Sequence, residues 1–262
     1  MKNILIINLI LVLFASCGGP EPQNKYIKYQ NIVILSDMSS RLDNKPSKDF
    51  EEIHKIVQFF KEECVKPGEK IGDKSSISFS VLSGKTAYSI DLSKIKTVGE
   101  KQQFINSTGK YHNVGLIKEI EAFEKTAKRV YATTRNQGLD LISILSEKIE
   151  NEPIIKHNKQ LINGVDTTFV NYENHIYIFT DGYLEYLNKK INSQFYFGSN
   201  EINKLRQLCK VNNMDIADVL KTNSSFCLPP VKNNKNRNIS LHILETHERD
   251  KDDKSQTYKN SK

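Results

Sequence analysis

The apolar run at residues 31–36 ends directly in a carboxylate, Asp37, which is followed by a hydroxyl at Ser39 and a guanidinium at Arg41. Short runs that are apolar and β-branched throughout are typical of strands covered on both faces in a parallel sheet. Open sheets of this kind bind ligands at the edge where the carboxyl ends of the strands lie. The run therefore predicts a buried strand whose polar end lies at a functional crevice.

Apolar stripes and turn residues predict that strands and helices alternate along the chain. Helices are expected at 49–65, between Leu116 and Val130, and at 138–150, 199–211 and 214–221, and further strands at 77–82, 87–92, 175–180 and 239–244. The strands at 77–82 and 87–92 are expected to form a hairpin. Asp49 and Glu52 predict a capping box at the start of the first helix. The polar segment 151–173 is predicted to be irregular. The alternation predicts an α/β fold with a doubly wound, mostly parallel central sheet, helices on both faces and an edge hairpin.

A second apolar strand, which begins at His175, also ends in a carboxylate, within the sequence Thr180-Asp181-Gly182. Thr133 and Thr134 come before the helix predicted at 138–150. In a doubly wound sheet all these positions can meet at one edge. Carboxylate and hydroxyl oxygens suit a hard cation such as Mg²⁺ or Mn²⁺. The candidate metal ligands are Asp37, Ser39, Thr134 (with Thr133 as the alternative) and Asp181.

This arrangement resembles the von Willebrand factor type A domain and its metal-ion-dependent adhesion site, over residues 31–245. In that family the first strand ends in Asp-x-Ser-x-Ser, a threonine precedes a mid-domain helix, and a later strand ends in Thr-Asp-Gly. Asp37 and Ser39 match the first motif, Thr134 matches the threonine, and residues 180–182 match the last motif. The resemblance implies a domain that binds a protein partner, with Mg²⁺ or Mn²⁺ at the contact, and no enzymatic activity.

Arg41 stands where the family has its second serine. Two carboxylates about 4 Å apart repel each other by roughly 4 kcal/mol at a surface-like dielectric. A metal ion can relieve that repulsion if Arg41 points away, or Arg41 itself can pair with Asp37 and Asp181 and replace the ion. The sequence leaves two interpretations open: a metal-dependent binding domain, or a metal-free scaffold with a dead site.

The N-terminal residues predict a lipid-modified export signal. Lys2 precedes an apolar run at 4–14, which is too short to cross a membrane but has the length of a signal-peptide core. Small residues stand just before Cys17, which resembles a bacterial lipoprotein lipobox. Residues 1–16 are then the signal peptide and Cys17 is the lipidated residue. An ordinary secretory signal with an incidental cysteine is the alternative.

The resemblance to a lipoprotein implies attachment to a membrane of a Gram-negative cell envelope, without indicating which membrane. Residues 17–30 are expected to be a flexible tether, and 246–262 a polar tail. An exported chain lies in a compartment that permits disulfides. Cys209 and Cys227 can therefore form a bridge, or they and Cys64 can all be free thiols; both alternatives stay open.

The formal net charge of +7 is best explained by a lysine-rich solvated surface. The basic clusters lack the single face with interleaved aromatics that nucleic-acid binding requires, so no nucleic-acid partner is expected. A hydrolase such as a phosphatase is a further alternative. Ser39, however, stands where phosphatases of the haloacid-dehalogenase class have their second aspartate. The chain also has no phosphate-binding loop and no nucleophile elbow.

Overall fold

A computed structural model of the chain describes residues 24–38, 46–68, 74–135, 140–151, 154–163, 166–180, 184, 195–230 and 238–244. The predictions for Cys17, Ser39, Arg41 and Asp181 lie outside these residues, as do those for the signal peptide and the polar tail. The chain divides into two compact units. The larger comprises Tyr29–Lys156 and Glu173–Lys262, and the smaller comprises Met1–Lys28 and His157–Tyr172.

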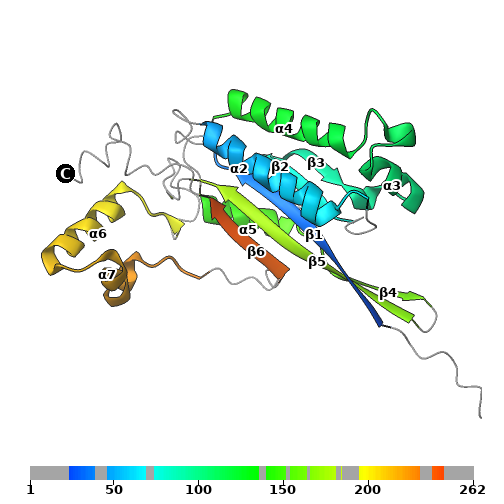
Figure 1. Cartoon of the computed structure of the whole chain (residues 1–262). Coiled ribbons are helices and arrows are strands. Elements are labelled where there is room, and N and C mark those ends of the chain that lie inside the picture. The colour runs from blue at the N-terminus through cyan, green and yellow to red at the C-terminus, as the bar shows by residue number, and fades with distance from the viewer. Residues whose placement is uncertain are drawn as a thin grey trace, which may run out of the picture. The chain divides into compact units, whose positions relative to one another are not determined.

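The larger unit is a mixed α/β structure with a mostly parallel sheet (Figure 1). Its strands belong to β1 (Asn24–Ser36), β2 (Ser76–Val81), β3 (Thr86–Asp91), β5 (Asp166–Phe179) and β6 (Ile239–Leu244). They are ordered β3-β2-β1-β5, and β6 pairs with β5. The β1–β2 and β5–β6 pairs are parallel, whereas β2 and β3 form the predicted antiparallel hairpin.

Helices connect these strands. They are α2 (Pro46–Phe59), α3 (Val98–Ile105), α4 (Leu116–Thr133), α5 (Leu141–Asn151), α6 (Ser199–Asn212) and α7 (Ile216–Thr222), and a π-helical segment, Phe60–Val65, continues α2. The predictions of α4, α5, α6, α7 and β6 are confirmed to within a few residues. Among the described helices, none combines the length and the apolarity needed to cross a bilayer.

Strand β1 supplies the centre of the core, as its apolar run predicts. Because successive side chains of a strand point to opposite faces, β1 contributes to two separate clusters. Ile32 and Ile34 pack with residues of α2 and α4. Val33 and Leu35 pack with residues of β5 and α5. All four side chains are fully buried, so the end of β1 is held in place by packing on both faces.

Strand β1 and helix α2 both begin earlier than the sequence indicates. β1 starts at Asn24, so residues 24–30, predicted as the end of a flexible tether, are part of a strand. The exposed start of this strand has no apolar alternation from which it could be predicted. α2 starts at Pro46, so the predicted capping box at Asp49 is wrong. Asp49 instead lies inside the helix with a fully buried side chain.

Most of the described residues of the segment 151–173 belong to strands, in contrast to the prediction of an irregular segment. β4 (Lys159–Asn163) pairs antiparallel with the first residues of β5, and this pair forms most of the smaller unit. Within the same unit Tyr26 stacks on Phe169, with ring centroids 4.9 Å apart. Every residue of β4 is exposed, and for this reason the strand shows none of the apolar periodicity that predicts strands.

Cys64, Cys209 and Cys227 are free thiols in the structure, so the bridge between Cys209 and Cys227 is not formed. Cys64 is buried beside the core, and this burial raises the pKa of its thiol to about 12. A thiol with so high a pKa is a poor nucleophile and behaves as a small apolar side chain.

Candidate functional site

The ends of β1 and β5 lie side by side, as the sequence predicts for the two strands that end in aspartate. The backbone N–H of Asp37 donates to the carbonyl oxygen of Phe179 at 2.8 Å. The hydroxyl of Thr180 donates to Oδ2 of Asp37 at 3.2 Å, and both side chains are buried. The first predicted motif therefore meets the residue directly before Asp181, while Asp181 and Ser39 themselves lie outside the described residues.

A buried chain of hydrogen bonds lies next to this edge. The hydroxyl of Tyr131 donates to Oδ2 of Asp49 at 2.7 Å and lies 2.5 Å from the hydroxyl of Ser36. Because the tyrosine proton is used on Asp49, the serine hydroxyl is the donor in the second bond. Tyr131 lies in the last turn of α4, Asp49 in α2 and Ser36 at the end of β1. The three groups thus join three elements directly beside Asp37.

Sequence reasoning missed this chain of hydrogen bonds. Tyr131 follows Ala127 by four residues on the apolar stripe of α4, and both are buried. A tyrosine at a buried stripe position needs a partner for its hydroxyl. That rule could have indicated the importance of Tyr131, although it could not have identified Asp49 and Ser36 as the partners.

Thr134 lies directly after the end of α4, three residues beyond Tyr131. Its N–H still donates to Val130, and the guanidinium of Arg135 donates to the carbonyl oxygens of Tyr131 and Thr134 at 2.6 and 2.8 Å. The hydroxyl of Thr133 donates within its own helix, to the carbonyl oxygen of Arg129 at 3.0 Å. Thr134 is therefore the better candidate of the two threonines. Among the described residues no hydrogen bond joins it to Asp37.

Two of the predicted metal ligands, Asp37 and Thr134, lie among the described residues, and both bear oxygen atoms. The carboxylate of Asp37 and the hydroxyl of Thr134 are of the kind that Mg²⁺ and Mn²⁺ prefer. Within the described ranges no group of three His, Cys, Asp or Glu side chains could hold a metal ion. Because two of the four predicted ligands lie outside those ranges, the metal site stays a prediction.

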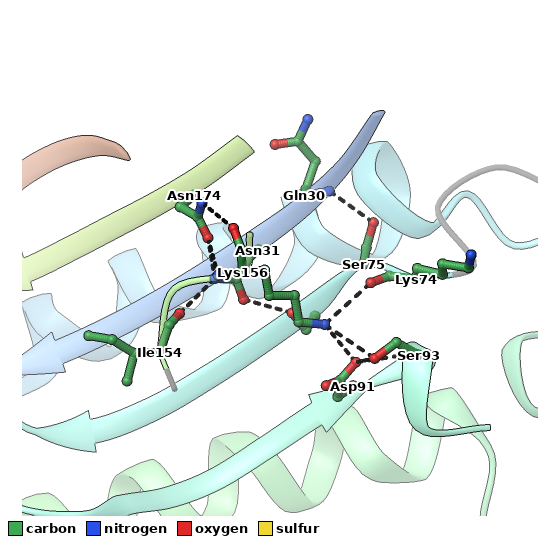
Figure 2. Close-up of polar contacts among 10 residues, drawn as sticks. Gln30, Asn31, Lys74, Ser75, Asp91, Ser93, Ile154, Lys156 and Asn174 are labelled. Atoms are coloured by element: carbon green, nitrogen blue, oxygen red, sulfur yellow. Dashed lines mark hydrogen bonds and ion pairs between the residues drawn. The ribbon is translucent and has the colours of Figure 1, made fainter. Parts of the chain in front are cut away.

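A second polar network crosses the sheet at the amino-terminal side of the buried strands (Figure 2). Nδ2 of Asn31 donates to Oδ1 of Asn174 at 2.7 Å, and the side chain of Asn174 also binds the backbone N–H and C=O of Lys156 at 2.9 and 3.0 Å. Asn31 precedes Asp37 by six residues, and Asn174 precedes Thr180 by six. The asparagine pair therefore fixes the same parallel register of β1 and β5 that places Thr180 against Asp37.

The side chain of Lys156 extends this network to the β2–β3 hairpin (Figure 2). Its ammonium group lies 2.8 Å from Oδ1 of Asp91, and the N–H of Ser93 donates to the same oxygen at 3.0 Å. Burial alone would raise the pKa of Asp91, but the hydrogen bonds from Lys156 and Ser93 outweigh it and lower that pKa. This pair is a structural link, since its acidic and basic groups are already used on each other.

Two histidines form a third cluster, on β5 and β6. Gln30 donates from its amide nitrogen to Glu173 at 2.7 Å, so its amide oxygen is left to accept from Nε2 of His175 at 3.0 Å. Neutral His175 therefore has an unprotonated Nδ1, which accepts from Nε2 of His242 at 3.1 Å. Burial and the charge of His242 lower the pKa of His175, against an opposing effect of Glu173.

The histidine pair predicts a pH dependence of stability. Because the pKa of His175 in the folded chain lies below its ordinary value of 6.5, the unfolded chain binds more protons in acid. The stabilisation from neutral His175 is complete above pH 6.5 and is lost as the pH falls from there through the lower folded pKa. We expect urea unfolding to show a smaller loss between pH 7.5 and pH 5 in His175→Gln than in the wild type. Equal losses would contradict this account of the pair.

Comparison with known proteins adds no relative. A scan against protein-family models finds no match, and a search of curated protein sequences finds none either. The functional interpretation therefore depends on the residues and contacts of this chain.

Proposed function

We propose that the chain is a lipid-anchored binding domain of the von Willebrand factor type A kind, which holds a protein partner at the edge formed by the ends of β1 and β5. The observation that carries the proposal is the hydrogen bond from Thr180 to Asp37 at 3.2 Å. It joins the residues of two motifs that lie far apart in the sequence and that the resemblance requires to be neighbours.

The arrangement of the larger unit supports the finer fold assignment. The strand order β3-β2-β1-β5, with β3 antiparallel at the outside, fits a doubly wound sheet with an edge hairpin. Helices α2 and α4 share one core cluster with β1, and α5 shares the other. In such a sheet the crevice beyond the strand ends is the ordinary place for a ligand. Lipid on Cys17 would keep the domain on a membrane of the cell envelope.

The cation at this edge has two possible sources. In the first, Mg²⁺ or Mn²⁺ is held by Asp37, Ser39, Thr134 and Asp181, and a carboxylate of the partner completes its coordination. In the second, Arg41 pairs with the aspartates and the partner contacts a metal-free edge. Either cation would offset the free-energy cost of burying the charged carboxylate of Asp37.

Partner binding should depend on the charge of Asp37. We expect crosslinking of the intact lipoprotein in its own membrane to give a partner adduct that falls at least about tenfold in Asp37→Asn, the loss expected for one charge-assisted contact. Asparagine keeps the size of the side chain and an acceptor for Thr180, so the variant should fold. Asp218→Ala, a change at an exposed aspartate on α7, is the matched control. Adducts of equal yield from the wild type and Asp37→Asn would disprove the proposed site.

Thermal unfolding of the wild type, Asp37→Ala and Arg41→Ser distinguishes the two sources of the cation. If a metal is bound, Mg²⁺ or Mn²⁺ raises the melting temperature of the wild type and leaves that of Asp37→Ala unchanged. If Arg41 replaces the metal, neither ion changes the wild type, and Arg41→Ser acquires the response. In both cases the crosslinking result for Asp37→Asn stays the same.

A further inference from the structure

One face of the smaller unit exposes large apolar side chains. The register of β4 and β5 sets Gln160 opposite Phe169 and Ile162 opposite Thr167, so these four residues share a face. Tyr26 stacks on Phe169 and extends the same face. Ile162 is 72% exposed and Tyr26 67% exposed. Large apolar groups that gather on a surface in this way mark an interaction site.

The polar residues of this unit suit an anionic surface. By strand alternation the exposed Lys28 lies on the same face as Tyr26. The described residues of the unit include three lysines, Lys25, Lys28 and Lys159, and one acidic residue, Asp166. Their net charge is therefore +2. Asp166 and Lys159 belong to the opposite face, as their pairing with Asn163 and Val170 shows. Lys25 alternates with Tyr26, so Lys28 is the charged residue on the apolar face. A tyrosine ring, an aliphatic side chain and a lysine together are typical of a membrane–water interface.

The length of the N-terminal chain limits how far this face can lie from a membrane. Seven residues lead from Cys17 to Asn24, the first residue of β1. Seven fully extended residues span about 25 Å at most. Lipid on Cys17, on which this step rests as part of the proposed function, would hold the start of β1 within that distance of the bilayer.

We infer that the face formed by Tyr26, Ile162 and Phe169 lies on the membrane surface, as a second and non-covalent contact beside the lipid on Cys17. Its partner is an anionic phospholipid bilayer. The apolar side chains enter the boundary between headgroups and acyl chains, and Lys28 meets the lipid phosphates. The contact would hold this unit against the bilayer in one orientation, which a lipid anchor at a single residue cannot do.

Photo-crosslinking from the lipid tests this contact on the intact lipoprotein. The protein is reconstituted into vesicles of phosphatidylcholine and phosphatidylglycerol that contain a phospholipid with a photoactivatable headgroup, and labelled peptides are mapped by mass spectrometry. We expect the peptides that contain Tyr26 and 159–169 to be labelled well above the peptide around the exposed Val211 on α6. Ile162→Asn should reduce this labelling about tenfold, the loss expected when one aliphatic side chain leaves the interface.

Leu161→Asn is the matched control, because residue 161 is exposed and lies on the opposite face of the same strand. It should leave the labelling within about twofold of the wild type, since the face that meets the lipid is unchanged. Equal losses in the two variants would overturn the assignment of the face. Uniform labelling of a lipid-modified protein would overturn the membrane contact, as would a dimer whose copies crosslink through 159–169. Absence of lipid on Cys17, read from the mass of the N-terminal peptide, would instead contradict the anchor in the proposed function.

Discussion

Replacing Asn174 by alanine is expected to lower the free energy of unfolding by at least about 3 kcal/mol. The side chain is 1% exposed and takes part in four hydrogen bonds. It accepts from Asn31 and from the N–H of Lys156, and it donates to the carbonyl oxygens of Lys156 and Asn238 at 3.0 and 3.2 Å. Alanine removes all four bonds, of which the bond to Asn31 is buried and those to Lys156 and Asn238 are part-buried. Each buried group that loses a bond which water cannot replace costs about 1–3 kcal/mol.

Urea denaturation of the wild type and the variant measures this loss. Asn171→Ala is the control, because Asn171 lies on the same strand, is only half-buried and has no side-chain hydrogen bond among the described residues. It should cost less than about 1 kcal/mol, like other substitutions outside the core. The double variant Asn31→Ala and Asn174→Ala should lose less than the sum of the single changes, since the two side chains share a bond. Similar losses for Asn174→Ala and Asn171→Ala would show that the network contributes nothing.

The same substitution should also weaken the proposed site at a distance. The Asn31–Asn174 pair and the Asp37–Thr180 pair are separated by six residues on each of the two strands. A change of one residue in register would turn every side chain of one strand to the other face. The asparagine pair at the amino-terminal side thus helps to keep the correct residues together at the carboxyl-terminal edge, where the proposed partner binds.

The sequence predicted those parts of the fold that bury an apolar run or a periodic apolar face. The run at 31–36 is continuously apolar, the hairpin of β2 and β3 and helix α4 show a clear period, and all three contribute to the core. β4 was missed because its five residues are exposed on both faces, so that no alternation could appear. The start of β1 was missed for the same reason. Apolar residues alternate along a strand because one of its faces is buried, so an exposed strand shows no such alternation.

The candidate site was predictable only in part. The residues at strand ends could be predicted, whereas a residue whose position depends on helix packing could not. Asp37 and the Thr180-Asp181 motif each follow a strand, and the rule that strand ends share one edge predicted that these two strand ends are neighbours, which the bond from Thr180 to Asp37 confirms. Asp49, by contrast, looked like a helix cap, because Asp is common at helix starts and Glu52 stands three residues later. Its burial against Tyr131 depends on how α2 packs on α4, and no local pattern in the sequence records that packing.

Tyr131→Phe is expected to lower the free energy of unfolding by about 2 kcal/mol. Phenylalanine keeps the ring and its contacts with Phe50 and Phe79, whose centroids lie 5.0 and 6.2 Å away. Only the hydroxyl is lost, and with it the donor to Asp49 and the acceptor for Ser36. Both of those groups are fully buried, so water cannot replace the missing bonds without a local opening of the structure.

Tyr88→Phe is the matched control for this prediction. Tyr88 also donates to a carboxylate, that of Glu119 at 2.8 Å, and its ring also contacts Phe123. Both residues are only partly buried, so the carboxylate can bind water once the hydroxyl is gone, and the cost should stay below about 1 kcal/mol. Thermal and urea unfolding of the two variants measure the difference. Equal costs would mean that the chain of bonds through Tyr131 is no stronger than a surface contact.

Because Tyr131 lies beside the proposed edge, Tyr131→Phe is expected to weaken partner binding as well as stability. Its hydroxyl links α2 and the end of α4 to the residue directly before Asp37, so its removal loosens all three elements at the proposed edge. Crosslinking of the partner should therefore fall in Tyr131→Phe under conditions where circular dichroism shows the variant to be folded, and it should not fall in Tyr88→Phe. Ser36→Ala removes a bond but leaves Tyr131 on Asp49, and it should give an intermediate result. If the Tyr131→Phe variant is folded and crosslinks the partner as fully as the wild type, this hydroxyl contributes to stability and not to binding.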